Sequence, residues 1–171
     1  MALVLKTNVA NFRHRGFESH PHRIKKMKTT QILIGGAIVF KDSRGKRTWL
    51  IIKQGGNGVW EIPKVTVRRG ESSVRSVLRL TGEMAGMATR VLEEAGRASQ
   101  VVTINSKSVP QKLLYYLLVH KAGSEVYGFE TYQWLEYAKA HKALETKREK
   151  DMLKSAKEIL TKWEKVETNR L

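Results

Sequence analysis

The chain has 171 residues, a formal net charge of +16 and no cysteine. A chain of this length can bury a sizeable core in one domain, and the lack of thiols excludes disulfide scaffolds, zinc ribbons and cysteine nucleophiles. The longest apolar run, residues 32–40, falls far short of the roughly 20 residues that cross a bilayer. We therefore expect a cytoplasmic protein without a membrane partner.

The first 26 residues differ in composition from the rest of the chain. They hold six Lys or Arg residues, a single acidic residue and three of the five histidines, with no sustained helical or strand period. We expect a disordered basic leader over residues 1–26 and a single domain over residues 27–171. Three interpretations of the leader remain open: a nucleic-acid-binding arm, an Arg-rich transit peptide, or upstream DNA translated ahead of a true start at Met27. The last rests on residues 15–23, which resemble a translated transfer-RNA gene.

From residue 30 onward, apolar periodicity and turn residues predict an α+β fold. We expect strands at 30–41 and 47–54, joined by a turn, and an extended segment at 59–71 after a glycine-rich loop. Helical spacing of apolar residues predicts a helix over 72–85 that ends at a glycine. Further strands are expected at 88–94, 98–104 and 112–121, and helices at 132–144 and 147–165. Together these elements predict an α/β/α sandwich in which helices flank a mixed sheet.

The order of these elements, with the sequence WEIPK at 60–64 and RRGES at 68–72 opening a helix, resembles the Nudix hydrolase family over about residues 30–165. The family's signature is Gly, five residues, Glu, seven residues, then Arg-Glu-aliphatic-any-Glu-Glu-any-Gly-aliphatic. The resemblance implies a hydrolase of a nucleoside diphosphate linked to another moiety. It also implies Mg²⁺ or Mn²⁺ as cofactor, assisting the attack of water on phosphorus.

The signature fits best without a gap, although it is degenerate. In this register Glu71, Arg79 and Glu83 match, whereas Leu80 and Met84 replace two carboxylates. We favour it because Glu71 and Arg79 lie eight residues apart, about two helical turns, on one helix face. The resemblance then implies catalytic roles for these three residues and metal binding by Glu71 and Glu83, with activity impaired by the lost carboxylates.

A second register needs ten extra residues and ends the signature later in the chain. It matches Glu93 and Glu94, which become the alternative metal ligands. The competing interpretation of these two residues is a pair of solvated carboxylates at a strand end and turn.

Basic residues next to the signature predict a phosphate-binding site. Lys64, Arg68 and Arg69 enter the predicted helix, and Lys53 on the second strand could face the same cleft. The competing interpretation is an ordinary solvated basic loop.

Two classes of function remain open. We favour a Nudix-type pyrophosphohydrolase acting on a nucleotide or dinucleoside polyphosphate. The alternative is a non-catalytic Nudix-like module that binds a nucleotide, an RNA or a ribonucleoprotein. The lysines of the last predicted helix form a solvated face or contact a nucleic-acid backbone, and the oligomeric state is left open.

Overall fold

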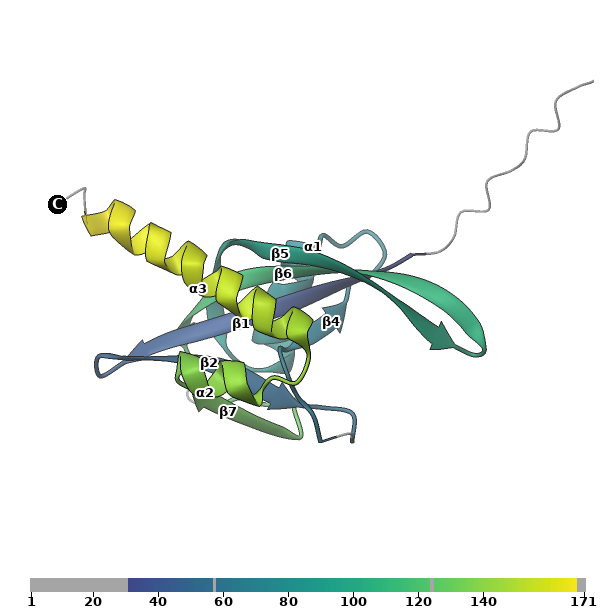
Figure 1. Cartoon of the computed structure of the whole chain (residues 1–171), viewed down its shortest axis with the longest axis horizontal. Coiled ribbons are helices and arrows are strands. Elements are labelled where there is room, and N and C mark those ends of the chain that lie inside the picture. The colour runs from purple at the N-terminus through teal and green to yellow at the C-terminus, as the bar shows by residue number, and fades with distance from the viewer. Residues whose placement is uncertain (1–30, 57, 124, 169–171) are drawn as a thin grey trace, which may run out of the picture.

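Helices cover both faces of a single seven-stranded mixed sheet in the computed structural model (Figure 1). The structure describes residues 31–56, 58–123 and 125–168, so the expectation for residues 1–26 lies outside the described residues. In Figure 1, α3 crosses the front of the sheet and α1 lies behind it. The predicted α+β sandwich is therefore confirmed.

The strands pair in the order β3-β2-β1-β6-β5, with β4 added to β1 and β7 added to β2. The parallel pair of β1 and β6 forms the centre, and β5 and β6 form a long antiparallel hairpin at one edge. The strands are β1 (Ile32–Ser43), β2 (Lys46–Lys53), β3 (Trp60–Glu61), β4 (Lys64–Thr66), β5 (Ala88–Ile104), β6 (Lys107–Ala122) and β7 (Thr131–Leu135).

The helical elements lie on the two faces of this sheet. They are α1 (Ser73–Arg79), the π-helical turn η1 (Leu80–Met84), α2 (Tyr137–Ala143) and α3 (Lys147–Thr168). Across the described ranges, none of them is both long and apolar enough to cross a membrane.

Alternating side chains of β1 enter two separate cores. Ile38 and Phe40 pack with residues of α2 and α3, whereas Ala37 and Val39 pack beneath α1 and η1. A strand that buries both faces is expected to read as a nearly continuous apolar run, as residues 32–40 do. The long apolar segment of the sequence is thus the central strand of the sandwich.

Two glycines of β1 allow close approach from either side. A Cβ atom on Gly35 would lie 2.5 Å from Oγ of Ser76 in α1, and one on Gly36 would lie 2.4 Å from the ring of Tyr115. The hydroxyls of Ser73 and Tyr116 add a hydrogen bond of 2.6 Å between α1 and β6. These contacts fix α1 against the sheet and so fix the orientation of its outer face.

Three predicted elements differ from the structure. The strands expected at 88–94 and 98–104 are one strand, β5, in which bulges near Glu93 and Gly96 absorb the irregular stretch. The helix expected at 132–144 begins later, because Thr131–Leu135 pairs with β2 as β7. Tyr132 and Trp134, aromatic residues that favour strands, pack in the core beneath α1.

Candidate functional site

A bidentate ion pair joins the loop after β4 to α1. Nε and Nη2 of Arg79 donate to the two carboxylate oxygens of Glu71, each at 2.9 Å. Oε2 of Glu71 also accepts the backbone N–H of Arg68 at 2.9 Å, and Nη2 of Arg79 donates to the carbonyl of Thr66 at 3.1 Å. We call this arrangement the Glu71–Arg79 clamp; it ties β4, the loop and the helix together.

The clamp also sets the charge state of Glu71. The Arg79 guanidinium and the Arg68 backbone N–H hold the pKa of Glu71 at about 2, against an ordinary value of 4.5. The side chain is only 14% exposed. Glu71 is therefore ionised at neutral pH with both oxygens already accepting hydrogen bonds, and it could ligate a metal only by giving up those bonds.

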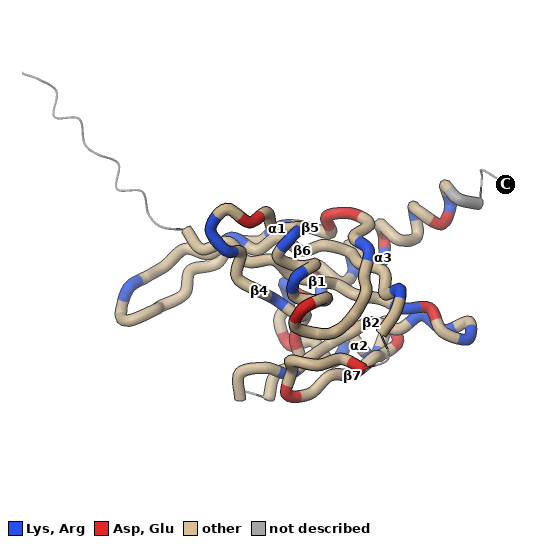
Figure 2. Tube along the Cα trace, turned by 180° about the vertical axis from the view of Figure 1, so that it is seen from behind, with Lys and Arg blue, Asp and Glu red and all other residues tan. Residues whose placement is uncertain are grey.

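A surface pocket of about 680 Å³ lies on the outer face of α1 and the loop before it. Figure 2 shows Lys and Arg positions gathered in that loop. In the described part of the chain, Arg68, Arg69 and Arg75 have no carboxylate within ion-pair distance, while Glu71 neutralises Arg79. We call this the arginine pocket. It is lined by Arg68, Arg69, Gly70, Glu71, Arg75, Leu78, Arg79, Gly82 and Glu83.

Leu80 and Met84, which replace two carboxylates of the signature, lie in different environments at the end of the helix. In η1 the backbone N–H of Ala85 donates to the carbonyl of Leu80 at 3.0 Å, a π-type bond five residues back. Leu80 is 1% exposed in the core beneath the helix, whereas Met84 is 37% exposed. One position therefore contributes to packing and the other faces solvent, and neither side chain offers an oxygen.

The residues of this helix do not form a cage for Mg²⁺ or Mn²⁺. Mg²⁺ requires oxygen ligands in near-octahedral geometry, and proteins usually provide it with carboxylates. Both oxygens of Glu71 are held in the clamp, so Glu83 is the carboxylate that remains in the arginine pocket. Within the residues that the structure describes, no group of three His, Cys, Asp or Glu side chains could hold a metal. Glu83 could therefore hold Mg²⁺ or Mn²⁺ only with water and ligand phosphates completing the metal's shell.

The alternative metal ligands lie in β5, away from the arginine pocket. Glu93 accepts the indole N–H of Trp163 in α3 at 2.8 Å. Glu94 forms an ion pair with Arg97 in the same strand. The structure thus gives both carboxylates partners of their own and does not bring them beside Glu71 or Glu83.

Lys64 lies apart from the arginine pocket, in an ion cluster with two carboxylates. Its ammonium group contacts Glu61 at 2.6 Å and also contacts Glu149, whose side chain is 2% exposed. Burial lowers the pKa of Lys64, but Glu149 and then Glu61 outweigh burial and raise that pKa above its ordinary value. The positive charge expected to bind phosphate is therefore balanced by protein carboxylates.

Sequence reasoning missed Glu149, which lies 85 residues from Lys64. Thr146 and Glu149 have the spacing of a capping box at the start of α3, and the Thr146 hydroxyl accepts the Glu149 N–H at 3.3 Å. The carboxylate instead accepts the backbone N–H of Ile62 at 3.1 Å and contacts Lys64. The sequence signal for Glu149 is this capping pattern, which predicts a helix-capping role and not a contact with Lys64.

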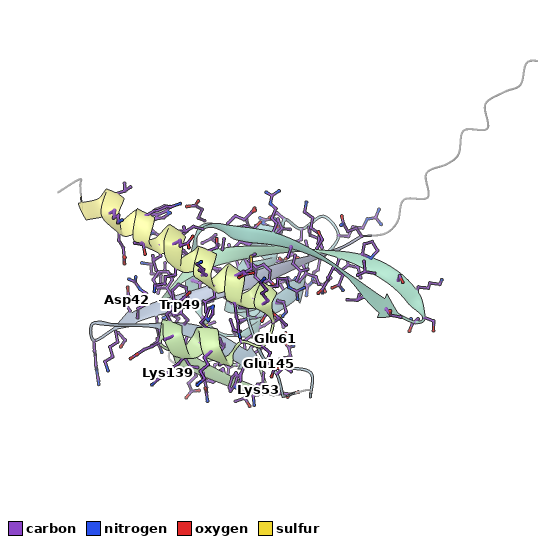
Figure 3. All side chains as sticks on the ribbon, in the orientation of Figure 1. Asp42, Trp49, Lys53, Glu61, Lys139 and Glu145 are labelled. Atoms are coloured by element: carbon purple, nitrogen blue, oxygen red, sulfur yellow. The ribbon has the colours of Figure 1, made fainter. Side chains whose placement is uncertain are left out.

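Lys53 also lies outside the arginine pocket. Its ammonium group is 4.8 Å from the centroid of the Trp60 ring, on the neighbouring strand. Figure 3 labels Lys53 and Glu61, which come from the paired strands β2 and β3. Of the four residues predicted to bind phosphate, the structure brings together Arg68 and Arg69 and adds Arg75, which the sequence had not singled out.

No protein-family profile and no curated protein sequence matches this chain. Solved structures match at low sequence identity. A Caenorhabditis elegans Ap4A hydrolase in a binary complex has a TM-score of 0.64 and 19% identity, covering 76% of this chain and 98% of its own. The Nudix domain of Shewanella oneidensis NrtR, complexed with ADP ribose, has a TM-score of 0.56 and 16% identity, covering 76% and 88%.

The Escherichia coli dihydroneopterin triphosphate pyrophosphohydrolase has a TM-score of 0.57 and 9% identity, covering 71% of this chain and 91% of its own. Identities this low carry information about the fold alone. The layered sheet, the position of α1 and these matches agree with the resemblance found in the sequence. The chain has the Nudix fold.

Proposed function

We propose that this protein binds the polyphosphate group of a nucleotide-type ligand in the arginine pocket. The observation that carries the proposal is the gathering of three arginines around one pocket, none of which forms an ion pair with a described residue. Guanidinium groups bind phosphate oxygens through paired, charge-assisted hydrogen bonds. Of the two carboxylates that line the pocket, Glu71 is paired with Arg79, although it also attracts Arg68, and Glu83 forms no ion pair among the described residues.

The backbone that carries these arginines is held in place, which supports the same proposal. Glu71 accepts the N–H of Arg68, and the Ser72 hydroxyl accepts the N–H of Arg75 at 3.2 Å. A loop fixed in this way loses less conformational entropy on binding than a mobile one. Leu78, which is 39% exposed in the pocket, offers an apolar contact to the nucleoside.

Hydrolysis of the bound ligand is the second candidate function. The Nudix fold and the position of Glu83 in the arginine pocket favour it. The engaged oxygens of Glu71 and the apolar Leu80 and Met84 weigh against it, because they leave one pocket carboxylate for a metal. We therefore rank binding first, and catalytic roles for Glu71, Arg79 and Glu83 stay predictions.

Calorimetric titration of the full chain with ATP, ADP-ribose and Ap4A, in EDTA, tests the binding proposal. We expect Arg75→Gln to weaken binding at least about tenfold, because a hydrogen bond to a charged group contributes roughly 1.5–3 kcal/mol. Arg90→Gln is the matched control, since Arg90 is exposed on β5 and the change in net charge is the same. Equal weakening by both variants, or no binding of any of the three ligands, would refute the proposal.

The same three compounds, incubated with the protein and Mg²⁺, separate the two candidates. Release of phosphate or mononucleotide that Glu83→Gln abolishes would establish hydrolysis. Binding without release would favour the non-catalytic module. Release that persists in Glu83→Gln would point to a contaminating enzyme, and a separate purification of that variant checks this.

A further inference from the structure

A second basic surface lies on the opposite side of the sheet, where α2 meets α3. The structure has a groove of about 420 Å³ there, open to solvent. We call it the lysine groove. It is lined by Tyr137, Lys154, Lys157, Glu158, Thr161, Lys162 and Lys165.

The charge of the lysine groove is not balanced by neighbouring carboxylates. Its four lysines make no ion pair with any residue in the described ranges, and Glu158 is the acidic residue that lines it. Nearby on α2, Lys139 is exposed and lies on the outer side of that helix (Figure 3). The groove therefore presents an excess of positive charge along one line.

An aromatic ring forms part of the same groove. The ammonium group of Lys157 lies 4.1 Å from the centroid of the Tyr137 ring, a cation–π contact. The ring is half-buried. The same ring also contacts Trp49 and His141, at centroid distances of 6.4 and 5.8 Å, so the fold holds it at the edge of the groove.

The helix that carries the lysines packs against the core as far as Leu160. Leu153, Ala156 and Leu160 on the other side of α3 are buried in the core. From Lys154 to Lys165 the helix rises roughly 16 Å at about 1.5 Å per residue.

We infer that the lysine groove binds the sugar-phosphate backbone of a single-stranded nucleic acid. A line of cations that follows the backbone, combined with an aromatic ring on which a base can stack, is the arrangement that binds single strands without sequence preference. An anionic membrane is a poorer partner, because membrane-binding helices insert an apolar face into lipid. The apolar face of α3 is instead packed against the sheet as far as Leu160, and beyond it Trp163 and Val166 are exposed.

The test is fluorescence anisotropy of the full chain with a labelled 12-nucleotide RNA, a DNA of the same sequence, and the RNA duplex, across a salt series. We expect Lys154→Gln, Lys157→Gln and Lys162→Gln combined to weaken single-strand binding at least about tenfold. The slope of log affinity against log salt should shrink by roughly 2, at about 0.7 per lost contact. The RNA and DNA arms show which strand is preferred.

The matched control combines Lys46→Gln, Lys107→Gln and Lys121→Gln, three exposed lysines on other elements that give the same change in net charge. We expect this control to retain the affinity within about twofold. Lys154→Arg, Lys157→Arg and Lys162→Arg combined keep the positive charge and should also retain the affinity. Circular dichroism melting of all three triple variants checks that each one folds.

Equal weakening by the control triple would show general charge attraction and overturn the inference. It would also be overturned by unchanged binding in the groove triple, by no single-strand binding at all, or by tighter binding to the duplex. Anionic vesicles of phosphatidylcholine and phosphatidylserine form the last arm. Vesicle binding without RNA or DNA binding would assign the groove to membranes and contradict the inference.

Discussion

Glu71 connects the stability of the fold with the shape of the arginine pocket. Its carboxylate accepts hydrogen bonds from the Arg79 side chain and from the backbone of Arg68, so one residue orients both the helix and the loop that precedes it. The clamp also pairs the negative charge of Glu71 with the positive charge of Arg79, so these two charges largely cancel in the pocket. What remains for a ligand is the positive charge of the loop and the first helical turn.

The clamp predicts how stability depends on pH. The pKa of Glu71, about 2 in the folded protein, lies below its ordinary value of 4.5. Its contribution to stability is therefore present above about pH 4.5 and is lost as the pH falls toward 2. We expect Glu71→Gln to lower the urea midpoint at pH 7, and the difference from the native chain to close between pH 4.5 and 2.5.

Glu145→Gln serves as the control for this pH series, because Glu145 is exposed and outside the clamp. Its urea midpoint should follow that of the native chain at every pH. A deficit in Glu71→Gln that stays constant down to pH 2.5 would show that the ionised carboxylate is not the source of the stabilisation.

The buried ion cluster of Lys64 and Glu149 predicts a large cost for removing one partner. Lys64→Met leaves the Glu149 carboxylate, 2% exposed, without a cation, and we expect a loss of about 3–5 kcal/mol in the free energy of unfolding. The double variant with Glu149→Gln should recover part of that loss, measured by urea unfolding as a double-mutant cycle. Lys107→Met, at an exposed position, should change stability by less than about 0.5 kcal/mol.

The same double variant separates the two roles considered for Lys64. If Lys64 bound phosphate, as the sequence predicted, its nucleotide affinity would fall sharply. We expect the affinity of the double variant to stay within about twofold of the native value, since Lys64 is absent from the lining of the arginine pocket.

At the scale of elements, packing of α1 against β1 determines where the pocket lies. Gly35→Ala would place a Cβ 2.5 Å from Oγ of Ser76 and 2.9 Å from Cγ1 of Val77. We expect it to lower the free energy of unfolding by about 1–3 kcal/mol and to weaken nucleotide binding by displacing the helix. Gly82→Ala is the control for stability, because nothing lies within 4 Å of its Cβ and alanine favours a helix by up to about 1 kcal/mol.

The degenerate end of the helix can be tested by restoring a carboxylate. Met84→Glu adds one beside Glu83 at an exposed position, and we expect Mn²⁺ binding, followed by electron paramagnetic resonance, to become tighter than in the native chain. Adding Glu83→Gln should remove the gain. Leu80→Glu would bury a carboxylate at a position 1% exposed and should cost more than about 2 kcal/mol in stability. Unchanged Mn²⁺ affinity in Met84→Glu would mean that this helix face does not approach a metal site.

Elements with strong periodicity could be predicted from the sequence, and contacts between distant segments could not. The central hairpin, the helix over 72–85 and the last helix follow from apolar spacing that matches one structure type. The spacing of residues 132–135 predicts a helix, and the strand that they form in β7 depends on pairing with β2, far earlier in the chain. The ion cluster of Lys64 could not be predicted for the same reason, since Glu149 reaches Lys64 only in the folded protein.

For the whole molecule, the part of the net charge of +16 that the described residues carry lies on separate surfaces. The arginine pocket lies on the α1 side of the sheet, and the lysine groove lies on the α3 side (Figures 1 and 2). Other basic residues, such as Lys64, are balanced within the fold. A fold with this arrangement can present two anion-binding faces separated by its own sheet.

This separation predicts that nucleotide and oligonucleotide bind at the same time. At constant ionic strength, saturating the arginine pocket with ATP should leave the affinity for a 12-nucleotide RNA unchanged within about twofold, measured by anisotropy. Arg75→Gln should weaken only the nucleotide, and the Lys154, Lys157 and Lys162 triple should weaken only the RNA. Competition between the ligands would require one shared surface, because screening beyond about 8 Å makes long-range charge coupling weak in physiological salt. Reciprocal weakening without displacement would instead indicate that the sheet couples α1 to α3.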